Sequence, residues 1–194
     1  MSTKTEKAIT WMEQLAADNS HGYDQTNRWG PDYDCSSAVI TAWERAGVKV
    51  KTAGATYTGN MRAVFLKNGF KDVSMWVDRA TMSGLRRGDV LLNEKHHTAM
   101  YCGNGYEVEA SINERGTARG GKTGDQTGKE ILKRNYRNYP WDCVLRYAGE
   151  AADDIAREVI AGSWGNGDKR KAELTASGYN YTEIQKKVNE ILKA

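Results

Sequence analysis

The sequence has few cysteines and no long apolar segment. Its 194 residues include only three cysteines, and no two of them have the Cys-x-x-Cys spacing of a metal site. An odd number of cysteines argues against a framework of disulfide bonds, so we expect a reduced protein made in the cytosol. The apolar stretch from Ile9 to Leu15 is interrupted by Thr10 and Glu13. We therefore expect neither a secretory signal peptide nor a membrane span.

A strong excess of charge of one sign is also lacking, since the formal net charge is +3. This mild positive balance is compatible with an anionic surface as partner, but it does not identify one. Apolar residues make up 39% of the chain, which is enough for a hydrophobic core. The length fits one domain of about 150 residues followed by a small module.

Hydrophobic spacing predicts helices in the first part of the chain and strands after them. Residues 4–18 and 36–46 have apolar side chains at helical spacing, and residues 61–70 resemble a third short helix. Short apolar runs typical of strands follow at residues 90–92, 98–102, 106–110 and 144–147, with a hairpin turn at 103–105. Helices followed by strands indicate an α+β domain with an antiparallel sheet.

The last part of the chain has the pattern of a small helical module. Residues 151–162 form an amphipathic helix in this prediction, Asp168 is expected to cap a second helix, and Thr182 is expected to cap a third. Three short helices can form a compact bundle, although one of this size is only marginally stable alone. We therefore divide the chain into residues 1–149 and 150–194.

A cysteine at the predicted start of the second helix is a candidate nucleophile. Cys35 lies between Asp34 and Ser36. The free amides of a helix N-terminus stabilise negative charge, so they favour the thiolate that attacks carbonyl carbons. The other two thiols, Cys102 and Cys143, lie in apolar segments typical of strands, and we expect them to be buried and structural.

A histidine and a glutamate on neighbouring predicted strands are candidate partners of this thiol. If residues 97–101 and 106–110 pair as a hairpin, His97 begins one strand and Glu109 lies on the other. The imidazole could take the thiol proton and return it to the leaving amine, while the carboxylate orients the ring and stabilises its cation. His96 is the alternative to His97. Neighbouring strand residues point to opposite faces, so only one of the two should face Cys35.

These motifs resemble the NlpC-type branch of the papain-like cell-wall peptidases, and especially the bacteriophage endolysins of that branch. The match extends over about residues 5–148. It consists of Asp34-Cys35-Ser36 at a helix start, Gly88-Asp89-Val90, His97, and a polar residue twelve positions later, with Tyr23 twelve positions before the cysteine. That last polar residue is often His or Asn in the family, so Glu109 is a departure from its pattern.

The resemblance implies a papain-like fold and a peptidoglycan hydrolase that cuts an amide bond through a thioester on Cys35. It makes His97 the general base and Glu109 the third member of the triad, and it gives Tyr23 a role in binding the oxyanion. A γ-D-glutamyl endopeptidase is the first choice, because the catalytic pattern is NlpC-like. An N-acetylmuramoyl-L-alanine amidase is the alternative, because related phage enzymes carry that assignment.

The family also uses residues beside its nucleophile to hold the peptide stem of the substrate. By this resemblance Asp34 and Ser36 are substrate-binding residues, and helix capping is an equal alternative for Ser36. Residues 115–128 are rich in glycine, threonine and charge and are expected to form a long surface loop. The loop of residues 115–130 could cover the cleft, or its glycines could only permit turns.

Residues 153–192 resemble the short cell-wall-binding repeat at the C-termini of some phage lysozymes and endolysins. The matching segments are Asp154–Gly162, Trp164–Gly167, Arg170, Leu174, Gly178-Tyr179, Tyr181 and Gln185–Leu192. The resemblance implies a three-helix bundle that binds the glycan-peptide unit of peptidoglycan. Trp164 can stack on a sugar or fill the bundle core, and Asn166 and Arg170 can bind hydroxyl or carboxylate groups. The family usually carries tandem repeats, so a single copy makes self-association one source of avidity.

The expected partner is therefore bacterial peptidoglycan, with no nucleic acid, membrane, metal or cofactor. The habit of phage enzymes implies synthesis in the host cytoplasm without a signal peptide, and action on the cell wall after release. Two other functions remain open from the sequence. One is a wall-binding protein without catalysis, and the other is an acyltransferase or transglutaminase on the same scaffold.

Overall fold

The computed structural model describes residues 4–112, 130–148, 152–177 and 179–193. It divides into two compact units, one formed by Lys4–Tyr147 and one that contains the residues from Ala148 onward. The surface loop expected at residues 115–128 lies outside the described residues. Within the described part of the chain, no helix is both long enough and apolar enough to span a membrane.

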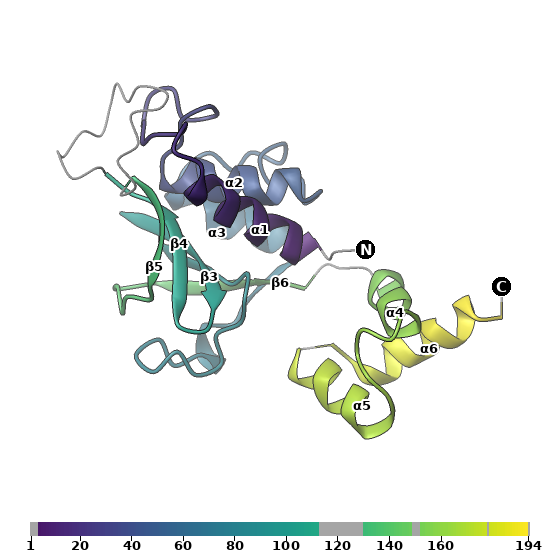
Figure 1. The fold of residues 1–194 in the computed structure, drawn as a ribbon. Helices are drawn as coiled ribbons and strands as arrows, with labels where there is room; N and C mark the ends of the chain where they lie inside the picture. The colour runs from purple at the N-terminus through teal and green to yellow at the C-terminus, as the bar shows by residue number, and fades with distance from the viewer. Residues whose placement is uncertain (1–3, 113–129, 149–151, 178, 194) are drawn as a thin grey trace. The chain divides into compact units, whose positions relative to one another are not determined.

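Three helices begin the first unit and lie together on one side of a sheet (Figure 1). They are α1 (Lys4–Ala17), α2 (Cys35–Arg45) and α3 (Thr58–Lys67). The predicted range of the third helix, 61–70, is wrong at both ends. The Asn60 side chain accepts hydrogen bonds from the backbone N–H groups of Thr56 and Tyr57 and so fixes an earlier start.

The sheet has six strands in the order β1-β6-β2-β3-β4-β5, and every pair of neighbours is antiparallel. Their bounds are β1 (Phe70–Asp72), β2 (Val90–Asn93), β3 (His97–Gly103), β4 (Tyr106–Ala110), β5 (Ile131–Asn135) and β6 (Cys143–Tyr147). A short 3-10 helix, Ser74–Trp76, follows β1. The expected α+β class with an antiparallel sheet is confirmed. The edge strands β1 and β5 were not predicted.

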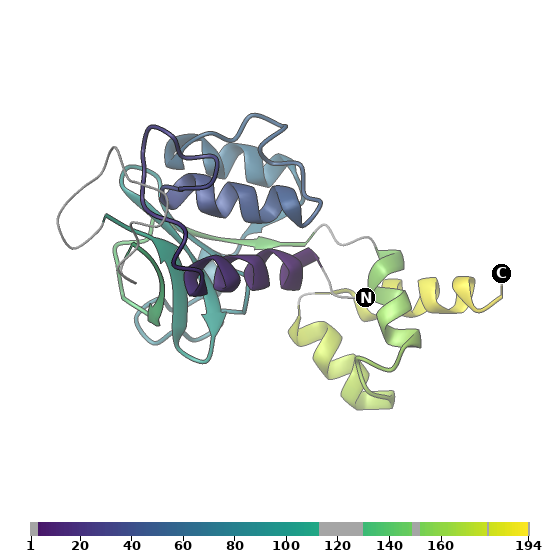
Figure 2. The ribbon, with the colours of Figure 1, turned by 45° about the horizontal axis from the view of Figure 1, so that its top comes forward.

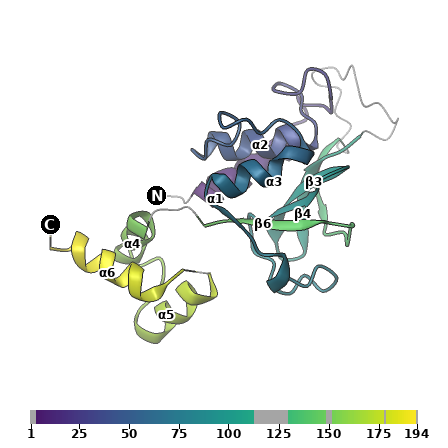
Figure 3. The same cartoon turned by 180° about the vertical axis from the view of Figure 1, so that it is seen from behind.

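The two faces of the sheet pack against different partners, as the alternation of strand side chains requires. Val108 belongs to the main core, which the three helices cover (Figures 2 and 3). Ala99 and Tyr101 belong to a smaller cluster with Trp141. Tyr101 pairs with Glu107 across β3 and β4, so Glu107 and Glu109 point away from the helices.

The second unit is a three-helix bundle of α4 (Ala152–Ile160), α5 (Gly167–Ala176) and α6 (Tyr181–Ile191). Its core is apolar and consists of Ile155, Ala156, Val159, Leu174, Ile184 and Val188. Both predicted caps are wrong. Asn166 occupies the N-cap position of α5, and the Asn180 side chain caps α6 by accepting from the N–H groups of Thr182 and Glu183. Asparagine is preferred to threonine at this position, which explains the second error.

Candidate active site

Cys35 is the first residue of α2, and a capping box holds it there. Asp34 accepts a hydrogen bond from the Ser37 backbone N–H at 2.7 Å, and Ser37 Oγ accepts one from the Asp34 N–H at 2.9 Å. The Cys35 side chain takes no part in this cap. It lies beside the free amides at the positive end of the helix dipole, which stabilise a thiolate.

His97 lies between Cys35 and Glu109. Its Nε2 is 2.5 Å from Glu109 Oε2, which leaves Nδ1 as the ring nitrogen available to the Cys35 sulfur. Burial lowers the pKa of His97, but the hydrogen bonds to Cys35 and Glu109 and the charges of both outweigh it and raise the pKa to about 9. The imidazolium is therefore favoured near neutral pH. His96 is exposed, so the structure brings His97 and not His96 to the thiol.

Two aromatic residues that the sequence analysis missed hold the His97 ring. Trp141 stacks on it with a centroid distance of 6.0 Å and an interplanar angle of 23°, and Tyr139 packs edge-on at 5.7 Å. Trp141 is buried. These contacts restrict rotation of the imidazole and keep both ring nitrogens aimed at their partners. The aromatic run Tyr136 to Trp141 was the available signal.

Glu109 is fully buried, and two arginines that the sequence analysis also missed contact it. Arg137 Nη2 donates to Oε2, and Arg134 Nη1 lies 3.3 Å from Oε1. Burial raises the pKa of Glu109, but the hydrogen bond from His97 and the positive charges around it lower the pKa overall. The carboxylate is therefore ionised and can stabilise the imidazolium.

Tyr23 lies beside the thiol, as its place in the sequence motif predicts. Its hydroxyl accepts a hydrogen bond from Gln25 Nε2 at 3.1 Å. Burial and the negative charge of the neighbouring Cys35 sulfur raise the pKa of Tyr23, so the phenol stays protonated. A neutral hydroxyl at this position can donate to an oxyanion formed at Cys35.

Asp34 and Ser36 are both buried, and an arginine occupies their polar atoms. Arg28 Nη1 lies 2.6 Å from Asp34 Oδ2 and donates to Ser36 Oγ at 3.1 Å, while its Nη2 donates to the Thr56 carbonyl at 2.5 Å. Ser36 Oγ donates to Asp34 Oδ1, so Asp34 rather than Ser36 caps the helix. Substrate binding by Asp34 and Ser36 stays a prediction, and Arg28 is the residue of this group that was not foreseen.

The remaining two cysteines are buried, as expected. Burial raises the pKa of Cys102 and of Cys143 to about 12, so both are thiols near neutral pH. The described residues contain no group of three His, Cys, Asp or Glu side chains that could hold a metal ion.

In the three-helix bundle, the three predicted wall-contacting residues lie around the start of α5. Trp164 is half-buried, packs edge-on against Tyr179 at 5.7 Å and donates its indole N–H to Glu158. Arg170 donates to the Asn166 side chain at 2.9 Å and to the Gly165 carbonyl at 3.1 Å. The contacts of Trp164 support its alternative role in the bundle core.

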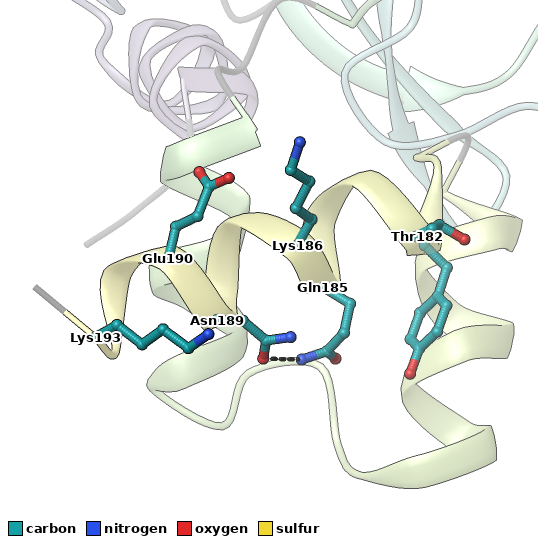
Figure 4. Close-up of a pocket in the computed structure, with 7 residues that line it drawn as sticks. Thr182, Gln185, Lys186, Asn189, Glu190 and Lys193 are labelled. Carbon is teal, nitrogen blue, oxygen red and sulfur yellow. Dashed lines mark hydrogen bonds between the residues drawn. The ribbon is translucent and has the colours of Figure 1, made fainter.

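A groove with a volume of about 520 Å³ runs along α6 (Figure 4). It is lined by polar, charged and aromatic side chains, namely Tyr181, Thr182, Gln185, Lys186, Asn189, Glu190 and Lys193. Gln185 and Asn189 point to one side of the helix and hydrogen-bond to each other, whereas Lys186 and Glu190 point to the other. Trp164, Asn166 and Arg170 do not line this groove.

Comparison with known proteins gives two family matches. Residues 29–108 match the model of an endolysin-like domain, and residues 153–192 match the model of a CW_7 repeat. The first match contains Cys35 and His97 and ends one residue before Glu109. No curated protein matches the chain.

Two solved structures from Trichomonas vaginalis are similar to part of the chain. NlpC2 has 17% sequence identity and a TM-score of 0.45, and NlpC1 has 16% identity and a TM-score of 0.44. Each alignment covers 76% of this chain, but only 47% of NlpC2 and 45% of NlpC1. The chain thus spans less than half the length of either protein.

Proposed function

Because residues 29–108 form an endolysin-like domain and residues 153–192 a CW_7 cell-wall-binding repeat, we propose that this protein hydrolyses an amide bond of peptidoglycan through a thioester on Cys35. One observation carries the proposal. Cys35, at the start of α2, is followed by His97 and then by Glu109 in one line of neighbouring side chains. A nucleophile, a base in contact with it and a group that orients the base are the parts of an acyl-transfer site.

The first half of the reaction forms the acyl-enzyme. With the proton already on His97, the Cys35 thiolate attacks the carbonyl carbon of the amide. The amides at the start of α2 and the Tyr23 hydroxyl bind the oxyanion. When the C–N bond breaks, the imidazolium gives its proton to the leaving amine, and the acyl group remains on sulfur as a thioester.

The second half returns the enzyme to its starting state. His97 takes a proton from water, and the resulting hydroxide adds to the thioester carbonyl. The same donors bind the second oxyanion, and the sulfur leaves as a thiolate beside the His97 imidazolium, while the acyl group departs as a carboxylic acid. In both halves Glu109 stabilises the imidazolium, so its buried negative charge acts whenever His97 holds the proton.

Two amide bonds of peptidoglycan are the candidates, and the γ-D-glutamyl bond is the first choice because the catalytic motif is NlpC-like. Digestion of purified walls, followed by mass spectrometry of the fragments, identifies the residue that carries the new amino group. We expect the new amine inside the peptide stem. New amines on the L-alanine next to muramic acid, with free lactyl ends and none inside the stem, would instead identify an N-acetylmuramoyl-L-alanine amidase.

The remaining functions lead to different products. An acyltransferase or transglutaminase would incorporate an added amine rather than release fragments, and the cell-wall-binding repeat argues against it. A wall-binding protein without catalysis would release no fragments at all. The proposed site of action is the cell wall, reached after synthesis in the host cytoplasm, and self-association through the single repeat stays a prediction.

In the bundle we propose that Asn166 and Arg170 contact the wall and that Trp164 mainly maintains the fold. Replacing Trp164 with alanine should lower the free energy of unfolding of the bundle by about 1–3 kcal/mol, because the packing on Tyr179 is lost. Trp164→Phe keeps a ring there and should restore both thermal stability and co-sedimentation with walls. A Trp164→Phe protein that is stable but no longer binds walls would assign the indole to the ligand instead.

A further inference from the structure

A single arginine connects two buried carboxylates on β4, next to the proposed triad. Arg137 Nε donates to Glu107 Oε1 at 2.8 Å, and its backbone N–H donates to Glu107 Oε2 at 3.3 Å. Its Nη2 donates to Glu109 Oε2, the same oxygen that binds His97 Nε2. Both glutamates are fully buried, whereas the Arg137 side chain is 32% exposed.

We propose that Arg137 is a positioning residue of the hydrolytic reaction, which fixes the Glu109 carboxylate on His97 and is itself fixed by Glu107. The inference rests on the proposed function, because it assigns a task to Glu109 in catalysis. Arg137 acts through Glu109 and His97, and we do not place it in contact with the substrate.

The first argument is geometric. A glutamate carboxylate rotates freely about its last side-chain bond unless its oxygens are held. Here Oε2 is held from two directions, by His97 and by Arg137, while Arg134 lies 3.3 Å from Oε1 and is 41% exposed. Arg137 is anchored through both its backbone and its side chain. A misplacement of about 1 Å in such a chain can lower a catalytic rate on the order of 100-fold.

The second argument is electrostatic. Glu107 and Glu109 are two residues apart on one strand and point to the same face, so their negative charges repel each other in a buried site. Burial and the charge of Glu109 raise the pKa of Glu107, which shows the strain of this pair. The planar guanidinium can bind two carboxylates at once through different N–H groups, which a lysine ammonium does less well.

The charged groups around Glu109 come from several elements. His97 faces it from β3, Arg134 from β5, Glu107 from its own strand β4, and Arg137 from the segment before β6. Cys35 faces His97 from α2. Without Arg137, the described cations left beside the two buried carboxylates are the more exposed Arg134 and the His97 imidazolium. The pair should then bind a proton, and the carboxylate that supports His97 is loosened or neutral.

The expected result for Arg137→Ala is a kcat on the order of 10- to 100-fold lower, with KM little changed, because ground-state binding is not touched. The alkaline limb of the pH profile should move to lower pH by about one unit, because a weakened Glu109 no longer stabilises the imidazolium as well. Arg62→Ala is the matched control, since Arg62 also bridges two carboxylates, those of Asp72 and Glu94. Arg62→Ala should leave kcat and the position of the alkaline limb unchanged.

Two further variants keep the test decisive if Arg137→Ala does not fold. Arg137→Lys retains the positive charge but loses the planar guanidinium that binds both carboxylates. It should have a kcat between those of Arg137→Ala and the wild type. Glu107→Gln keeps the side-chain shape, weakens the anchor of Arg137, and should shift the alkaline limb in the same direction by a smaller amount. Wild-type profiles in these variants, or an alkaline limb that moves to higher pH, would overturn the proposal.

A readout that needs no cell wall separates this proposal from the proposed function. The rate of Cys35 alkylation by iodoacetamide, followed by mass spectrometry across pH, reports thiolate formation and, in its upper step, deprotonation of His97. We expect that upper step at lower pH in Arg137→Ala than in Arg62→Ala. If the upper step occurs at the same pH in both variants, the role of Arg137 is overturned. If the step is shifted but the wild type does not hydrolyse walls, only the proposed hydrolase function is overturned.

Discussion

Replacing Cys35 with alanine is expected to lower the release of soluble peptidoglycan fragments by about 1,000-fold or more, because no other described thiol can form the acyl-enzyme. The fold should survive. The Cys35 side chain takes no part in the capping box, which consists of Asp34 and Ser37. Co-sedimentation with purified walls should stay at the wild-type level, since the CW_7 match begins at residue 153. Fragment release and co-sedimentation are measured on the same preparation.

Cys102→Ala is the matched control, because it removes a buried thiol in the same unit, away from the start of α2. It should release fragments at a rate close to that of the wild type. If Cys35→Ala released fragments as fast as this control, the proposed nucleophile would be wrong. If the wild type bound walls and released nothing, the protein would belong with wall-binding proteins that lack catalysis.

Replacing Glu109 with glutamine should lower kcat by about 100- to 10,000-fold, because a neutral amide cannot stabilise the imidazolium. The wild-type alkaline limb is expected near pH 9, where His97 loses its proton. The Glu109 charge raises the pKa of His97, so its removal lowers that pKa, and burial lowers it further. The alkaline limb should therefore move to lower pH. The measurement is kcat and kcat/KM for fragment release across pH.

Glu44→Gln tests whether any loss of a hydrogen-bonded carboxylate has the same effect. Glu44 is at the other end of α2 and accepts hydrogen bonds from Thr52 and from the Lys51 backbone. We expect an unchanged pH profile in this control. A Glu109→Gln enzyme with the wild-type alkaline limb would show that Glu109 does not complete the triad, which is the position where this chain departs from the family pattern.

Local features of the sequence were sufficient to place Cys35 at a helix start and His97 beside Glu109 on a hairpin, whereas the resemblance to the NlpC-type family brought the thiol to the histidine. A helix start fixes the thiol, and a hairpin with a recognisable Gly103 to Gly105 turn fixes the other two residues. Alternation along a strand predicted that only one of His96 and His97 faces Cys35, and the resemblance to the NlpC-type family chose His97. The two family matches support an endolysin-like domain and a CW_7 repeat. The catalytic roles proposed for the three residues depend on the geometry of the site.

Other parts of the site could not be predicted because they depend on contacts between distant segments. Arg137 is 28 residues from Glu109 in the sequence, and Trp141 reaches His97 from the segment before β6. No local pattern connects an arginine to a particular buried carboxylate, so the sequence predicts an ordinary surface residue at Arg137. Arg28 was missed for the same reason, since its partners Asp34 and Thr56 lie on separate segments.

The errors in the fold arose where the local signal was short or ambiguous. β1 has three residues and follows α3 after Asn68 and Gly69, so its apolar Phe70 was assigned to the helix. β5 contains Ile131 and Leu132 followed by three polar residues, which do not alternate as a half-buried strand should. Pairing with β4 rather than side-chain pattern makes this segment a strand.

The same two strands have a consequence for the behaviour of many copies on one surface. They are the edges of the sheet, where unpaired backbone groups could otherwise pair with another molecule. β1 is too short to offer a long template, and β5 ends in Lys133, Arg134 and Asn135. An enzyme that gathers on an insoluble polymer reaches a high local concentration there. The short length of β1 and the basic end of β5 oppose strand pairing between neighbours, so we expect no aggregation from crowding on the wall.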